Sequence, residues 1–74
     1  MSEATFIVYG RFLVRLARSA DGLWRAAEVG FEGKTRPLPE VLVPEHARVD
    51  DLPGYLEAAF HELARPGEAI VRVG

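Results

Sequence analysis

His61 and Glu62 are the residues of this chain best suited to acid–base or metal chemistry, because they adjoin as in the HExxH helix of zinc proteases. Arg65 stands where that helix carries its second histidine, and His46 is the one other histidine. With no cysteine in the chain, a metal site would have to borrow carboxylates. We therefore expect no metal and no cofactor. We expect a non-enzymatic protein. If the protein is an enzyme, the alternative site is a helix-side site of His61, Glu62 and Arg65.

Two glycine motifs resemble phosphate-binding loops but lack the context that such loops need. The Gly-Lys-Thr sequence at residues 33–35 ends like a P-loop, yet Glu28 stands where the first glycine is required. A P-loop also runs into a helix, which Pro37 and Pro39 forbid here. The GxxG sequence at residues 30–33 joins helices in KH domains, whereas strand-like sequence flanks it here. We interpret both motifs as turns.

Four arginines of the predicted sheet are candidates for contacts with DNA or RNA: Arg11, Arg15, Arg25 and Arg36. The net charge of the chain is −2, which is not the basic footprint typical of nucleic-acid-binding proteins. The strand pairing predicted from a two-residue turn at Asp21 and Gly22 also places Glu28 opposite Arg15 and Glu32 opposite Arg11. Neutralised arginines contribute little to phosphate binding. A nucleic-acid-binding or antitoxin-like role is therefore ranked second, as the alternative function.

Composition indicates one small globular domain covering residues 1–74. Hydrophobic residues make up 49% and charged residues 27% of the 74 residues, unlike a disordered chain. A domain this small has a thin core, and in a secreted protein it usually carries disulfides, which the absence of cysteine excludes. The first residues lack the basic and apolar regions of a signal peptide, and no apolar stretch is long enough for a membrane span. We expect a cytoplasmic protein without a membrane partner.

Apolar alternation predicts a long first strand over residues 5–18. The even-numbered positions from Phe6 to Leu16 are apolar apart from Gly10, which is expected to bend or bulge the strand. A period of two with one wholly apolar face is typical of a half-buried strand.

Asp21 and Gly22 predict a hairpin with a two-residue turn. This turn places Leu16 opposite Ala27 and Val14 opposite Val29. A three-residue loop would instead place Val14 opposite Glu28. In the favoured register Trp24 lies on the face away from the helix, whereas a slip of one residue would send Trp24 into the core.

The third strand is predicted over residues 34–43, at the edge of the sheet. Pro37 and Pro39 lie two residues apart, so both missing N–H groups would face solvent. A helix follows, with apolar residues at helical spacing from Leu52 to Ala64 and a cap from Asp50 or Asp51. A short fourth strand over residues 69–73 beside the first strand is the last expected element.

The predicted fold is therefore α+β, with a three-stranded antiparallel meander and one C-terminal helix packed on one face (βββα), and the optional fourth strand. The helix is expected to cover five sheet residues: Phe12, Val14, Leu16, Ala27 and Val29.

The sheet face away from the helix is the candidate binding surface, because exposed apolar area with Trp, Tyr and Arg often marks a partner site. The predicted members of this surface are Tyr9, Arg11, Leu13, Arg15, Trp24 and Val41. We expect a small protein-interaction module that binds a protein partner or a second copy of itself.

Four segments resemble a small bacterial family of stand-alone uncharacterised proteins: GRFLVR at 10–15, DGLWR at 21–25, GKTRP at 33–37 and FHELARPG at 60–67. The resemblance implies a bacterial cytosolic protein and supplies no activity. Residues 21–27 are also similar to the Gly-x-Trp-x-Ala strand of HicB-type antitoxins. Residues 22–29 with 34–36 are similar to the middle of the plant AP2-type DNA-binding domain, which has three strands and a helix.

Overall fold

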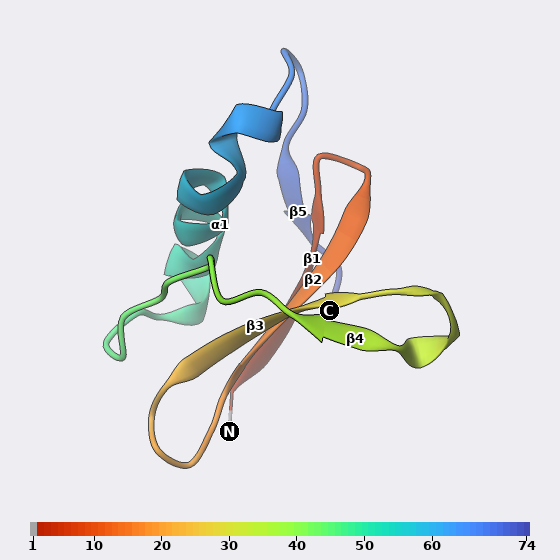
Figure 1. Ribbon diagram of the computed structural model, residues 1–74. Coiled ribbons are helices and arrows are strands. Elements are labelled where there is room, and N and C mark those ends of the chain that lie inside the picture. The colour runs from red at the N-terminus through yellow and green to blue at the C-terminus, as the bar shows by residue number, and fades with distance from the viewer. Residues whose placement is uncertain (1) are drawn as a thin grey trace.

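The computed structural model describes residues 2–74 as one antiparallel sheet with a single α-helix (Figure 1). The strands run in the order β4-β3-β2-β1-β5 across the sheet. Their bounds are β1 Glu3–Val8, β2 Phe12–Arg18, β3 Trp24–Val29, β4 Thr35–Pro37 and β5 Ile70–Arg72. The helix α1 spans Leu52–Phe60, and short 3-10 turns occupy Phe31–Gly33 (η1), Val49–Asp51 (η2) and His61–Leu63 (η3). The α+β class, the C-terminal helix and the last strand beside β1 are confirmed, but the sheet has five strands rather than three.

The expected first strand over residues 5–18 is in fact the hairpin of β1 and β2. Tyr9 and Gly10 form its turn with φ values of 53° and 70°, and the Arg11 N–H donates to the Val8 carbonyl at 3.0 Å. Val8 pairs with Phe12, so even-numbered residues of both strands lie on the same face. The hairpin therefore has the same apolar alternation as one continuous strand, which explains the wrong prediction.

The hairpin of β2 and β3 closes with a three-residue loop, so the predicted two-residue turn is wrong. Val14 pairs with Glu28, and the Ser19 N–H donates to the Leu23 carbonyl at 3.1 Å around a loop that contains Gly22 at φ 83°. Asp-Gly suits this loop as well, because glycine takes the left-handed position before the strand resumes. The slip of one residue puts Trp24 on the core face, and Ala27 and Val29 on the opposite face.

β4 is an edge strand, as predicted, but it ends at Pro37 instead of Val43. Pro37 is exposed and pairs with Ala27, while the next residue, Leu38, donates its N–H to the Ala26 carbonyl at 2.9 Å. Pro39 lies beyond the strand, in a turn closed by the Val41 N–H on the Leu38 carbonyl. The chain then leaves the sheet edge to cover the core.

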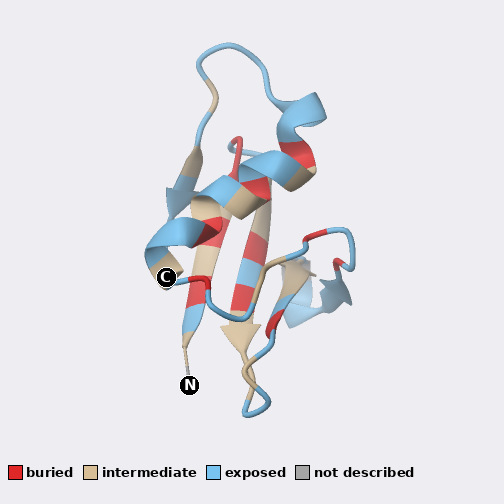
Figure 2. Cartoon of the chain, turned by 90° about the vertical axis from the view of Figure 1, so that its left-hand side faces the viewer, coloured by how far each residue is buried: buried red, intermediate tan, exposed pale blue. Residues whose placement is uncertain are grey.

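The core lies between one face of the sheet, called here the core face, and a cover made of α1 and residues 38–48 (Figure 2). α1 contributes Leu52, Leu56 and Phe60, spaced four residues apart on one side of the helix. The Phe60 ring meets Phe12 edge to face, with 5.3 Å between centroids. Phe12, Val14 and Leu16 lie on the core face as predicted, and Phe12 meets α1 at Phe60, but Ala27 and Val29 lie on the other face because of the register slip. The helix also ends earlier than expected, since residues 61–63 continue as a 3-10 turn.

Candidate interaction surface

The open face is the side of the sheet opposite α1 and residues 38–48, and it is formed by alternate residues of the strands. Strand pairing places these side chains on it: Glu3, Thr5 and Ile7 of β1, Leu13, Arg15 and Ala17 of β2, Arg25, Ala27 and Val29 of β3, and Val71 and Val73 at the β5 edge. These residues come from both ends of the chain, so only the assembled sheet brings them together.

An aliphatic row crosses four strands of the open face. Strand pairing sets Val71 beside Ile7, Ile7 beside Leu13, and Leu13 beside Val29. Val71 is 54% exposed, and the other three side chains are half-buried. Val73 extends the apolar area next to Thr5 and is equally open to solvent. Leu13 was predicted from the sequence, whereas Val71 and Val29 were missed because they depend on the pairing of β5 and on the register of β3.

Arg15 lies next to this row, between two short side chains. Its cross-strand neighbours are Thr5 and Ala27, and its own side chain is exposed. Among residues 2–74, neither Arg15 nor Glu3 forms an ion pair. Glu3 lies on β1, one same-face position along from Thr5, so one acid and one base occupy neighbouring places on an otherwise mostly apolar face.

Trp24 belongs to the core rather than to the open face, which corrects the predicted surface. Only 7% of Trp24 is exposed, and its Nε1–H donates to the Ala47 carbonyl at 3.1 Å. The Arg18 guanidinium stacks on the indole, 4.7 Å from the ring centroid, and donates to the same carbonyl. Tyr9 and Val41 are also buried, the first in the hairpin turn and the second in the cover. The predicted surface therefore retains Leu13 and Arg15.

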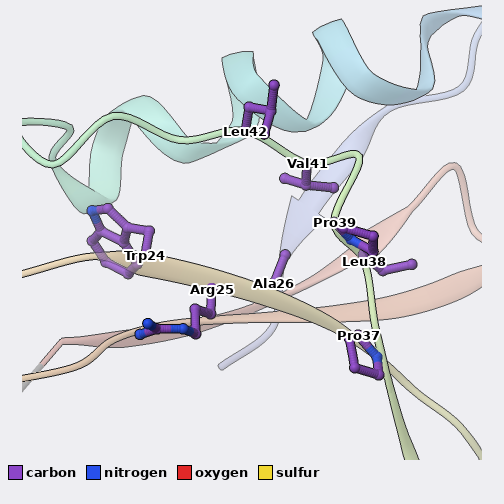
Figure 3. Close-up of a pocket in the computed structure, with 8 residues that line it drawn as sticks. All are labelled: Trp24, Arg25, Ala26, Pro37, Leu38, Pro39, Val41 and Leu42. Atoms are coloured by element: carbon purple, nitrogen blue, oxygen red, sulfur yellow. The ribbon is translucent and has the colours of Figure 1, made fainter.

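A pocket of about 340 Å³ opens beside Trp24, between β3, the end of β4 and the cover (Figure 3). Figure 3 shows Trp24 and Ala26 on the side of β3 that faces residues 38–48, with Arg25 directed to the other side. The rest of the lining is apolar: Pro37, Leu38, Pro39, Val41 and Leu42. Arg25 is the single titratable residue among those that line the pocket, and it is engaged elsewhere, so the pocket lacks an acid–base pair for catalysis.

Three of the four candidate arginines form ion pairs, although not the pairs that the sequence suggested. Arg11 binds Glu68 at 2.6 Å, Arg25 binds Asp21 at 3.0 Å, and Arg36 binds Glu28 at 2.7 Å. Arg11 also donates to the Leu63 carbonyl, which ties the first hairpin turn to η3. The predicted pairs of Arg15 with Glu28 and of Arg11 with Glu32 are wrong, because Val14 rather than Arg15 lies opposite Glu28, and Glu32 lies in the η1 turn.

The Asp21 carboxylate accepts hydrogen bonds within the hairpin of β2 and β3. The hydrogen bond from Arg25 is the main cause that lowers the pKa of Asp21 to about 2, and the Leu23 backbone N–H adds to it. Both contacts lie at the hairpin tip, and the carboxylate is solvent-exposed. This ionised group therefore supports the turn and is not placed for acid catalysis.

The three residues of the alternative helix-side site do not converge. His61 and Glu62 lie exposed in η3, and His61 Nδ1 is 3.2 Å from the Ala58 carbonyl. Arg65 follows η3 and donates its backbone N–H to Glu68 at 2.8 Å. Within residues 2–74, no three His, Asp or Glu side chains are grouped as metal ligands would be. The same residues contain no helix with the length and hydropathy needed to cross a bilayer.

Comparison with known proteins identifies a family. A domain of unknown function, DUF7661, matches residues 3–73, nearly the whole chain. The comparisons with curated proteins and with solved structures found no match. The similarity to a small uncharacterised family is thus confirmed, whereas the likenesses to HicB-type antitoxins and AP2-type domains find no support.

Proposed function

Because this chain belongs to the DUF7661 family, whose description assigns no activity, we propose a function from the geometry of its surface. We propose that the protein is a small non-enzymatic protein-interaction module that binds its partner through the open face of the sheet.

The aliphatic row across β5, β1, β2 and β3 is the observation that carries this proposal. A soluble sheet with one free face normally alternates apolar and polar residues, so that the free face is polar. Here Val71, Ile7, Leu13 and Val29 lie in register on the free face. Complete burial of one such side chain stabilises a complex by roughly 1.5–3 kcal/mol, and half-buried ones add a part of that. Four in a row supply an apolar centre for an interface.

The charges of the molecule favour a protein partner over nucleic acid. Binding of phosphates depends on free cationic side chains, and Arg11, Arg25 and Arg36 each bind a carboxylate of this chain. Of the four candidate arginines, only Arg15 has no carboxylate partner within residues 2–74, and one arginine does not form a basic stripe. A protein surface that is largely apolar and carries an acidic group fits the open face better.

A photo-crosslinking experiment in the native host tests the proposal. A photoreactive leucine analogue is placed at Leu13 on the open face or, as a matched control, at Leu63, which is 46% exposed in η3. We expect a discrete adduct from position 13, absent from position 63, and its loss in the Ile7→Glu variant. Far-UV circular dichroism checks that this variant folds. Equal labelling at both positions, or no discrete adduct at position 13, would overturn the proposal.

A further inference from the structure

We infer that the partner of the open face is a second copy of this chain, packed face to face about a two-fold axis that runs parallel to the strands between β1 and β2. The inference rests on the proposed function and adds the identity and the arrangement of the partner.

The aliphatic row matches itself under this rotation. Because the axis lies midway between β1 and β2, each Ile7 faces Leu13 of the second copy. The next strands outward are β5 and β3, so each Val71 faces Val29 of the second copy. Aligned sheets pack face to face about 10 Å apart, with aliphatic side chains filling the space between them. Every member of the row therefore meets another aliphatic side chain.

Arg15 and Glu3, the two charged residues of the open face that form no ion pair within residues 2–74, are complementary under the same rotation. It carries each Arg15 over Thr5 of the second copy, because Arg15 and Thr5 are paired across the same axis. Glu3 lies on the same strand as Thr5, one same-face step away, which is about 7 Å. Ala17, the next same-face residue of β2, is short and pairs with Glu3, so Glu3 of the second copy lies over Ala17 and the guanidinium has room to extend along the strand toward it. Arg15 of each copy thus reaches Glu3 of the other, and two ion pairs form.

A two-fold axis across the strands fits less well. If it passed through the aliphatic row, that row would still meet itself. Arg15 would then lie over the Tyr9–Gly10 turn region of the second copy, far from any Glu3. An arginine enclosed without an acidic partner destabilises an interface. The charge pattern therefore selects the axis parallel to the strands.

Charge reversal tests the ion pairs in purified protein. Dimer dissociation is measured by light scattering and sedimentation over a concentration series for Glu3→Arg, Arg15→Glu and the double variant. Each single reversal replaces two symmetry-related attractions by repulsions, so we expect Kd to rise about tenfold. The double variant should return to within about twofold of the unaltered chain. Glu57→Arg, on the exposed side of α1, is the matched control and should leave Kd unchanged.

Crosslinking tests the position of the axis. The chain has no cysteine, so Val71→Cys and Val29→Cys each introduce a unique thiol. Facing positions in this arrangement are about 10 Å apart, too far for a disulfide but within reach of a short bis-maleimide. Val71 of one copy and Val71 of the other do not face each other, because they are offset across the sheet by three strand spacings, about 14 Å. With one variant isotope-labelled, we expect mixed crosslinks of Val71→Cys to Val29→Cys and few crosslinks within either variant alone.

The outcomes separate this inference from the proposed function. A monomer at all concentrations, together with a cellular adduct at Leu13 to a different protein, would overturn the second copy as partner and leave the interaction module intact. A dimer without rescue in the double variant, or with crosslinks mainly within one variant, would overturn the arrangement. Absence of any adduct at Leu13 in cells would overturn the proposed function itself.

Discussion

Replacement of Trp24 by alanine is the substitution that most directly tests the register of the sheet. Trp24 is 7% exposed, and its Nε1–H donates to the Ala47 carbonyl at 3.1 Å. Truncation of a buried tryptophan typically costs 3–5 kcal/mol, because the apolar contacts are lost and a cavity remains. A 74-residue domain has a total unfolding free energy of about 4–11 kcal/mol, so Trp24→Ala should remove a large part of the stability.

Trp24→Phe should be milder than Trp24→Ala, because the phenyl ring keeps much of the apolar contact that alanine loses. Arg18 also donates to the Ala47 carbonyl, so this acceptor keeps a partner when the indole N–H is removed. The expected cost is about 1 kcal/mol for the lost hydrogen bond, together with the apolar contacts that the smaller phenyl ring does not make. Arg25→Ala is the matched control, since Arg25 is the next residue and points to the opposite, exposed side of β3.

The assay is urea and thermal unfolding followed by far-UV circular dichroism, because Trp24 is the single tryptophan of the chain and its fluorescence disappears with the substitution. A loss of at least about 3 kcal/mol corresponds to a fall in Tm of roughly 12 °C or more for a domain of this size. Arg25→Ala removes only the exposed ion pair with Asp21, so it should lower the unfolding midpoint far less than Trp24→Ala does. If Trp24→Ala unfolds with a free energy within about 0.5 kcal/mol of the unaltered chain, Trp24 does not belong to the core and the three-residue loop is wrong.

Two further predictions concern the hairpin turns. The hydrogen bond from Arg25 is the main cause that lowers the pKa of Asp21 from 3.8 to about 2. Because the pKa is lower in the folded state, the ionised Asp21 stabilises the fold above pH 3.8, and this stabilisation is lost as the pH falls toward 2. An NMR titration of the carboxylate should show this midpoint, and Arg25→Gln should raise it; a midpoint near 3.8 in the unaltered chain would contradict the ion pair. Gly10→Ala should lower stability by about 1 kcal/mol in thermal unfolding, since φ is +70° and nothing lies within 4 Å of the added Cβ, so backbone strain is the whole cost. An unchanged Tm would argue against the left-handed turn.

The sequence by itself determined the elements that depend on local patterns. The alternation of apolar residues identified Phe6, Val8, Val14 and Leu16 as one buried face, because a period of two is a property of any extended chain. The helical spacing of apolar residues located α1, and Pro37 marked the edge strand, since proline cannot donate to a further strand. Residues 69–73 were identified as a strand beside the first one from their apolar composition.

The break between β1 and β2 was decided by the tertiary structure. An odd-numbered connection preserves which face each residue occupies, so a hairpin and a single long strand share one sequence pattern. The positive φ of Tyr9, a residue with a large side chain, gives no warning in the sequence.

The register of β3 was likewise decided by packing, and it changed the candidate site. The predicted register gained an ion pair between Arg15 and Glu28, but exposed pairs contribute at most about 1 kcal/mol. The observed register buries the indole of Trp24, which has a much larger apolar area, and satisfies its N–H on Ala47. Because a shift of one residue exchanges the two faces of a strand, this one packing choice moved Trp24 into the core and completed the open face with Val29.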